Sequence, residues 1–387
     1  MLTIVADANI PHAEAAFGAL GTVTPLAGSA ITREALRDVD VLVVRSVTRV
    51  GADLVDGTPV QFVATATAGV DHVDVEALRQ RGIAFASAPG SNAASVVDYV
   101  LAALLALAAD RGETLRGRTL GVVGAGEVGG RLVPRARALG LRVVVSDPPR
   151  ATAGLDDHHY LSLDDLLRQS DVVTLHTPLT RAPESSWPTA GMIDADALGR
   201  MRPGAWLINA ARGEVADGPA LLGARRSGHL GALVLDVWPE EPVPDPALVE
   251  VTDLATPHIA GYAADAKTRG TAMIAAALVR WAEGQGIASP TWRPPPVSEI
   301  GLDAPPLDLA PDAWLDALIR QAYDVRADDS RFRAALLDRS GDARAAAFSA
   351  LRKGYPERFE LSRYSVRGRT PDGLTDAIGV GLGVSIR

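Results

Sequence analysis

The segment from Arg118 to Asp147 constrains the fold of this chain more than any other. It reads RTLGVVGAGEVGGRLVPRARALGLRVVVSD, an apolar run, three spaced glycines, a helical stretch, a second apolar run and an acid. Gly124 can supply a tight turn, Gly126 lets a pyrophosphate approach the backbone, and Gly129 allows close packing of helix on sheet. Because Asp147 lies 18 residues beyond Gly129, its carboxylate can bind an adenosine ribose and would repel a 2′-phosphate. The segment therefore predicts a dinucleotide site that favours NAD.

The sequence around the glycines supports this interpretation, since glycines alone also mark ordinary loops. Thr119 to Val123 is predicted to be a buried strand, Val128 to Leu139 a helix and Arg142 to Ser146 a parallel strand. Two details fit less well. Pro134 falls inside the predicted helix, where it should cause a kink, and the proximity of Arg150 to Asp147 leaves NADP open.

Composition limits the class of protein. The 387 residues suffice for two or three domains, and 47% are hydrophobic. A net charge of -9 argues against nucleic-acid and membrane-surface partners. The absence of cysteine excludes disulfides and thiolate metal ligands, and no metal is predicted. Only Lys267 and Lys353 are lysines, so arginines, backbone amides or hydroxyls are expected to bind an anionic substrate.

No targeting segment is expected at the N-terminus, because MLTIVADANI has no basic region before its apolar run. The expected location is cytoplasmic. The longest apolar stretch, Ala93 to Ala109, is interrupted by Ser95 and Asp98 and is marginal in length for a membrane span. We therefore expect it to form a buried core helix.

Short apolar runs alternate with helical stretches in both the first hundred residues and the middle of the chain. This alternation predicts an α/β fold with parallel sheets covered by helices. The predicted strands are Leu2 to Ala6, Val39 to Val44, Val60 to Ala66, Ile83 to Ala86, Val172 to Leu175, Ala205 to Ile208, Leu233 to Val237 and Leu254 to Ala255. A proline-rich linker from Pro290 to Pro311 precedes a third unit, with a helical pattern over Asp312 to Leu351 and a strand over Phe359 to Val366.

Three polar residues follow predicted strands in the second half of the chain: Arg212 in NAARG, Glu241 in LDVWPEEP and His258 in TPHIAGY. Together they suit oxidation of a 2-hydroxy acid. Arg212 can bind the carboxylate and polarise the forming carbonyl, His258 can take the hydroxyl proton, and Glu241 can fix the tautomer and stabilise the protonated ring. Each alone is more typical of a solvated or capping residue, but their joint occurrence after a dinucleotide motif favours catalysis.

These motifs, with HTPLT at His176 to Thr180, resemble the D-isomer-specific 2-hydroxyacid dehydrogenases over nearly the whole chain. Other segments resemble one branch of that family, whose substrate is a small phosphorylated 2-hydroxy acid; they include VVRSVTRV, ATATAGVDHVD, SAPGSNAASVVDYV, YDVRADDSRFR and LRKGYPERFE. The poorly matching segments are Arg181 to Ala190 and the final DAIGVGLGVSIR.

The resemblance implies roles for individual residues. The catalytic set is Arg212, Glu241 and His258. The cofactor contacts are Gly124, Gly126, Glu127, Val128, Gly129, Asp147, Thr177, Ala210, Asp236 and Gly261. The substrate contacts are Ser46, Thr67 and Tyr262, with backbone amides of Ala68, Gly69 and Val70 facing the substrate carboxylate.

The resemblance also implies three domains in a homodimer. A flavodoxin-like substrate-binding domain comprises residues 1–95 and about 259–289, a doubly wound Rossmann domain binds NAD with residues 96–258, and a small α+β dimerisation domain spans residues 290–387. Two alternatives remain at this point. One is a dehydrogenase of the phosphoglycerate or glyoxylate type, and the other is a non-catalytic NAD sensor, which would not need the three polar residues.

Overall fold

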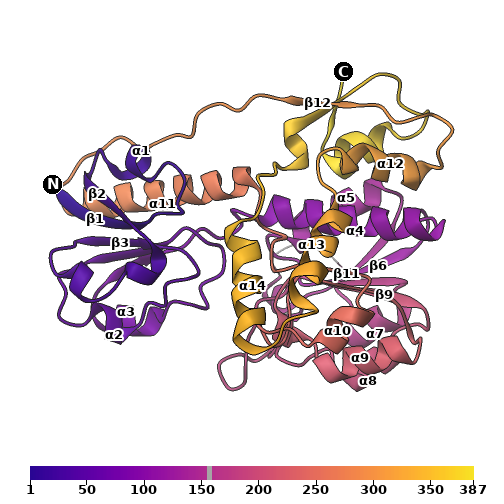
Figure 1. Ribbon diagram of the computed structural model, residues 1–387, viewed down its shortest axis with the longest axis horizontal. Coiled ribbons are helices and arrows are strands. Elements are labelled where there is room, and N and C mark those ends of the chain that lie inside the picture. The colour runs from indigo at the N-terminus through magenta and orange to yellow at the C-terminus, as the bar shows by residue number, and fades with distance from the viewer. Residues whose placement is uncertain (155–158) are drawn as a thin grey trace. The chain divides into compact units, whose positions relative to one another are not determined.

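A computed structural model describes residues 1–154 and 159–387, which form two compact units (Figure 1). Unit 1 comprises Met1–Ala93 and Tyr262–Val297, and unit 2 comprises Ala94–Gly261 and Ser298–Arg387. Each unit contains a parallel sheet, and helices connect its strands. The predicted α/β class is therefore confirmed.

Unit 1 is built on a five-stranded parallel sheet in the order β2-β1-β3-β4-β5. Its elements are β1 (Leu2–Asp7), α1 (Ala13–Phe17), β2 (Gly21–Leu26), β3 (Val41–Val44), α2 (Ala52–Val55), β4 (Phe62–Thr65), α3 (Val75–Gln80), β5 (Ala84–Ala86) and α11 (Ala264–Gly284). Helix α11 returns late in the sequence and buries one apolar face against this sheet. The hydroxyl of Thr271 donates to the carbonyl of Pro11 at 3.0 Å.

Unit 2 contains a six-stranded parallel sheet in the order β11-β10-β9-β8-β6-β7. Its strands are β6 (Thr119–Val123), β7 (Arg142–Ser146), β8 (Val172–Leu175), β9 (Ala205–Asn209), β10 (Leu230–Leu235) and β11 (Leu254–Ala255). Its connecting helices are α5 (Gly129–Ala138), α6 (Pro148–Ala153), α7 (Leu163–Gln169), α8 (Ala195–Arg200), α9 (Gly218–Arg226) and α10 (Pro246–Val251). The chain leaves β6 toward β7 on one side and later toward β8 on the other. This is the topological switch point, outside whose strand ends open α/β sheets bind ligands.

Helix α4 (Ala93–Arg111) is long and apolar enough to cross a membrane, but 83% of its most apolar stretch is buried inside the protein. Its polar groups have internal partners. Asp98 accepts from the amide of Leu361 at 2.8 Å and lies 2.8 Å from a guanidinium nitrogen of Arg135. The hydroxyl of Ser95 donates to Glu360 at 2.8 Å. These contacts support the interpretation of this stretch as a core helix.

The C-terminal part of unit 2 combines helices with a small parallel sheet in the order β12-β13-β14. Its elements are β12 (Ile300–Asp303), α12 (Pro311–Arg320), α13 (Val325–Leu336), α14 (Gly341–Lys353), β13 (Tyr364–Arg367), a π-helical turn (Ala377–Leu382) and β14 (Ser385–Ile386). The predicted helical stretch is thus divided into three helices. The predicted strand over Phe359 to Val366 begins late, because Leu361–Arg363 is a 3-10 turn.

Candidate active site

The glycine turn after β6 has the shape that a bound pyrophosphate requires. Gly124 has a φ of 89°, and a Cβ there would lie 2.6 Å from the carbonyl oxygen of His176. A Cβ on Gly129 would lie 1.9 Å from the carbonyl oxygen of Gly124. By contrast, a Cβ on Gly126 would meet no atom within 4 Å. Two glycines are thus fixed by packing, whereas the middle one borders open space in which a phosphate fits.

Asp147 lies at the end of β7 beside this turn. One carboxylate oxygen accepts from the amide of Ala125 at 2.8 Å, and the other accepts from the amide of Arg150 at 3.0 Å, which caps helix α6. A carboxylate has about four acceptor positions, so these two bonds orient it and leave capacity for ribose hydroxyls. The guanidinium of Arg150 donates to the hydroxyl of Tyr160 at 3.3 Å.

Thr177 follows β8 at the switch point, where its methyl group would lie 3.1 Å from a Cβ on Gly124. Its hydroxyl is buried and has no hydrogen-bond partner within the protein. Buried polar groups normally have partners, so this hydroxyl fits a contact with the cofactor. The adjacent His176 is buried as well, and burial lowers its pKa to about 3, which keeps the ring neutral.

The remaining predicted cofactor residues occupy different settings. Glu127 is exposed and pairs with Arg131, and Val128 is the N-cap of α5. Ala210 follows β9, and Gly261 is the last residue of its segment of unit 2.

The loop that carries Arg212 is shaped by Asn209, the last residue of β9. The side-chain oxygen of Asn209 accepts from the amide of Ala211 at 3.0 Å, and its amide group donates to the carbonyl of Arg212 at 2.9 Å. Gly213 packs so tightly that a Cβ there would lie 1.9 Å from the carbonyl oxygen of Trp238. The loop of Arg212 therefore lies directly against the loop that follows β10.

Trp238 joins the three loops of the site. Its amide donates to a carboxylate oxygen of Glu241 at 2.9 Å, and its indole donates to the carbonyl of Thr256 at 2.9 Å. The indole ring is buried and stacks on Phe332 of α13 with 5.3 Å between ring centres. The backbone and the indole of one buried residue thus contact the loops that carry Arg212, Glu241 and His258.

His258 and Glu241 are in direct contact. Nδ1 of His258 lies 2.8 Å from Oε2 of Glu241, and the two side chains are 33% and 23% exposed. Burial raises the pKa of Glu241. The charge of His258, the hydrogen bond from its ring and the hydrogen bond from the Trp238 amide lower it by more, so the net pKa lies below its usual value. The carboxylate is therefore the acceptor and Nδ1 the donor. This tautomer leaves Nε2 as the basic atom available to a substrate.

The backbone of His258 is held in an unusual conformation by Asp236. His258 has a φ of 59°, a left-handed value that costs about 1–3 kcal/mol in a non-glycine residue. Its amide donates to the carbonyl of Asp236 at 2.6 Å. The Asp236 carboxylate accepts from the amides of Ile259 and Ala260, at 2.8 and 2.9 Å, and from the hydroxyl of Thr256 at 2.7 Å.

Asp236 therefore supports the histidine loop, a role that sequence reasoning missed when it assigned this residue only to the cofactor. Burial raises the pKa of Asp236, and the charge of His258 and the three donors oppose that rise. An acid at the end of a strand gives no signal that separates these two roles.

The predicted substrate residues Ser46, Thr67 and Tyr262 lie in unit 1, whereas the predicted catalytic set lies in unit 2. Ser46 is exposed in the loop after β3. The Thr67 hydroxyl lies 2.7 Å from that of Thr65 and donates to the carbonyl of Gly69 at 2.8 Å. The second bond shapes the loop whose amides, at residues 68–70, were predicted to face the substrate carboxylate. The ring of Tyr262 lies 5.2 Å from the ammonium group of Lys267.

A buried guanidinium nitrogen, Nη1 of Arg45, has no hydrogen-bond partner within the protein. Arg45 lies directly after β3 and before Ser46. A buried charged donor without a partner is costly, so this loop is suited to an anion. Arginine was among the groups that the sequence led us to expect around an anionic substrate.

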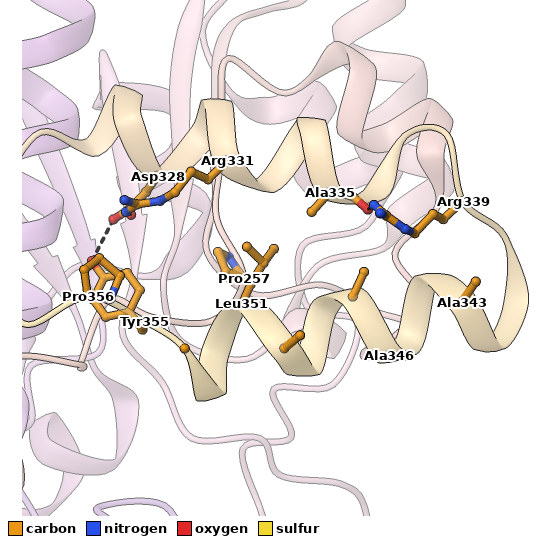
Figure 2. A pocket seen from close by; sticks show the side chains of 13 residues that line it. Pro257, Asp328, Arg331, Ala335, Arg339, Ala343, Ala346, Leu351, Tyr355 and Pro356 are labelled. Carbon is orange, nitrogen blue, oxygen red and sulfur yellow. Dashed lines mark hydrogen bonds and ion pairs between the residues drawn. The ribbon is translucent and has the colours of Figure 1, made fainter.

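A separate cavity of about 530 Å³ lies between α13 and α14 (Figure 2). Four alanines of α14 and Pro257 contribute to its lining, but Arg212, Glu241 and His258 do not. Over residues 1–154 and 159–387, no group of three or more His, Asp or Glu side chains is arranged to hold a metal ion.

Comparisons with known proteins agree with this geometry. Residues 103–260 match the family model described as D-isomer specific 2-hydroxyacid dehydrogenase, NAD binding domain, and residues 294–378 match a domain of unknown function. Erythronate-4-phosphate dehydrogenase of Salinibacter ruber is 50% identical over 95% of this chain and 94% of its own length. The enzyme of the same name from Azotobacter vinelandii is 49% identical over 95% of both chains.

Solved structures show the same fold. A putative D-isomer specific 2-hydroxyacid dehydrogenase from Polaromonas superposes with a TM-score of 0.62 at 26% identity, covering 75% of this chain and 99% of that one. D-lactate dehydrogenase from Aquifex aeolicus, solved with NAD and lactic acid, gives 0.61 at 24% identity, covering 73% and 96%. The chain belongs to the D-isomer-specific 2-hydroxyacid dehydrogenases and, within them, to the group whose curated members are named erythronate-4-phosphate dehydrogenase.

Proposed function

We propose that this chain is an NAD-dependent dehydrogenase that oxidises 4-phospho-D-erythronate to 2-oxo-3-hydroxy-4-phosphobutanoate, a step of pyridoxal 5′-phosphate biosynthesis. The hydrogen bond between Glu241 and His258 supports it most directly, because it provides an oriented base beside the Arg212 loop. The names of relatives that are about half identical over nearly the whole chain support the substrate.

NAD, when bound, supplies the acceptor for the hydride that leaves C2 of the substrate. Nε2 of His258 takes the proton of the C2 hydroxyl, and Glu241 stabilises the resulting imidazolium through Nδ1. Arg212 binds the substrate carboxylate with its planar guanidinium and stabilises the negative charge that develops on the C2 oxygen. Loss of the proton and of the hydride together convert the alcohol to a ketone.

The cofactor assignment to NAD rests on the glycine turn, the free hydroxyl of Thr177 and the carboxylate of Asp147. A 2′-phosphate beside Asp147 would be repelled. Arg150 donates to Tyr160, a contact that gives it a role within the protein apart from cofactor choice.

Arg45, Ser46 and Thr67 would bind the substrate phosphate. Nη1 of Arg45 is a buried donor without an acceptor in the protein, and the next residue, Ser46, is exposed. A guanidinium and hydroxyls at the ends of parallel strands suit a phosphate in a chain that has almost no lysine.

The enzyme would act in the cytoplasm as a homodimer, without nucleic-acid or membrane partners. The net charge of -9 and the burial of α4 support the absence of such partners. In this proposal residues 1–95 and about 259–289 bind substrate, residues 96–258 bind NAD, and residues 290–387 form the dimer.

Formation of NADH from NAD and 4-phospho-D-erythronate, followed by absorbance, tests this function. We expect saturable turnover that is lost in His258→Ala. An enzyme that binds NAD but forms no NADH with this acid would contradict the proposed reaction.

A further inference from the structure

The C-terminal segment that matches a domain of unknown function makes a direct contact with the histidine loop. The guanidinium of Arg358 donates to the carbonyl of Ile259 at 3.2 Å and also to the carbonyl of Ala260. These are the two residues after His258, and their amides are held from the other side by Asp236. The loop is therefore held by a carboxylate at its amides and by a guanidinium at its carbonyls.

Arg358 is itself buried beside two tyrosine rings. Only 7% of the residue is exposed, and the centre of its guanidinium lies 4.1 Å from the ring centre of Tyr323 and 6.0 Å from that of Tyr355. The hydroxyl of Tyr355 donates to Asp328 at 2.7 Å, as Figure 2 shows. A desolvated cation over an aromatic face is a strong interaction, so this side chain has little freedom to move.

A second series of contacts connects the cluster of Arg358, Tyr323 and Tyr355 with Asp236. The ring of Tyr323 lies 6.4 Å from that of Tyr99 in α4. The Tyr99 hydroxyl lies 2.8 Å from that of Thr256, which donates to Asp236. The cluster around Arg358 thus contacts the carbonyls of the histidine loop directly and is linked through Tyr99 and Thr256 to the carboxylate that binds its amides.

We propose that Arg358 is a positioning residue, through which the C-terminal segment holds His258 in its left-handed, catalytically competent conformation. This inference rests on the proposed function only in taking His258 as the base. A displacement of about 1 Å in a reacting group can cost about 10²-fold in rate, so a loosened loop should lower kcat while NAD binding is retained.

The test compares Arg358→Met, Arg358→Lys and a control, Ser95→Ala. The hydroxyl of Ser95 donates to Glu360 in the same C-terminal segment, away from the carbonyls of Ile259 and Ala260. Loss of this hydrogen bond in Ser95→Ala should lower Tm without changing kcat. Hydrogen exchange at the amides of Ile259 and Ala260 reports loop order without any substrate, and circular dichroism reports folding.

For Arg358→Met we expect exchange at these amides to be at least about 10-fold faster, kcat to fall about 10- to 100-fold, and the Kd for NAD to change less than about 3-fold. Arg358→Lys retains a cationic donor and should recover part of kcat. A folded Arg358→Met with wild-type exchange and kcat would overturn the proposal, as would an equal loss of kcat in Ser95→Ala.

If Arg358→Met does not fold, exchange in Arg358→Gln decides, because glutamine removes the cation but keeps a polar side chain: faster exchange confined to this loop supports the proposal, and wild-type exchange overturns it. If the wild type does not oxidise 4-phospho-D-erythronate, the proposed function fails, whereas the exchange measurement still tests the role of Arg358.

Discussion

Glu241→Gln is the substitution that tests the positioning of His258, the proposed catalytic base, most sharply. The carboxylate of Glu241 accepts two N–H groups at once, the amide of Trp238 at 2.9 Å and Nδ1 of His258 at 2.8 Å. A glutamine amide has only one oxygen acceptor. One of the two donors must therefore lose its partner, or the imidazole must adopt the other tautomer.

The magnitude follows from these two bonds. A hydrogen bond to a charged group contributes about 1.5–3 kcal/mol, and because the His258 side chain is 33% exposed, the lower half of that range applies. At about 1.4 kcal/mol for each factor of ten, kcat/KM should fall about 10- to 50-fold.

The pH dependence has a definite sign. The pKa of Glu241 is below its usual value because the effects of His258 and of the Trp238 amide outweigh that of burial. The carboxylate is thus ionised in the working range and stabilises the protonated ring. Without this carboxylate the acidic limb of kcat/KM should move to lower pH.

Steady-state NADH formation from about pH 5 to 9 measures both effects. Glu240→Gln is the matched control, because it removes a neighbouring carboxylate that is exposed, and it should leave the profile unchanged. An acidic limb that stays in place in Glu241→Gln would refute the pairing, even if the rate falls.

Three further substitutions or deletions test other parts of the account. His258→Ala removes the base, so kcat should fall about 10²- to 10⁴-fold with near-normal NAD binding by fluorescence titration; full turnover would contradict the mechanism. Asp147→Ala should raise the KM for NAD and lower that for NADP, and a wild type that uses both equally would contradict the assignment to NAD. Deletion beyond Pro290 removes Phe332 from its stack on Trp238, so we expect a poorly soluble monomer by gel filtration; a stable, fully dimeric product would argue against the proposed dimerisation domain.

Much of the sheet architecture could be predicted from the sequence because buried parallel strands form continuous apolar runs. Strands β6, β7 and β8 begin and end at the predicted residues. Strand β2 was missed: its sequence, GTVTPL, contains a proline, and only its first residue is buried at this edge of the sheet. Its first residue is fixed by packing, since a Cβ on Gly21 would lie 1.9 Å from the carbonyl oxygen of Leu2.

The site residues remain a prediction from the sequence, and the interactions that orient them could not be predicted. Arginine, glutamate and histidine after three strands indicated their chemistry, and parallel topology implied that they share one edge of a sheet. Nothing in the sequence indicated that Asp236 holds the histidine loop by its amides, or that Arg358 reaches its carbonyls from about a hundred residues away. Such contacts depend on how distant segments pack, which local patterns do not encode.

The central claim is the identity of the substrate, and comparison of kcat/KM for three acids tests it most directly. A phosphate bound away from the reacting carbon positions C2, so erythronate without phosphate should react at least about 10²-fold less efficiently than 4-phospho-D-erythronate. 3-Phosphoglycerate is one carbon shorter and should also be a poor substrate. In Ser46→Ala combined with Thr67→Ala, the preference for the phosphorylated acid should shrink. If 3-phosphoglycerate is the best of the three, or the double variant keeps the full preference, the proposed substrate and phosphate site are wrong.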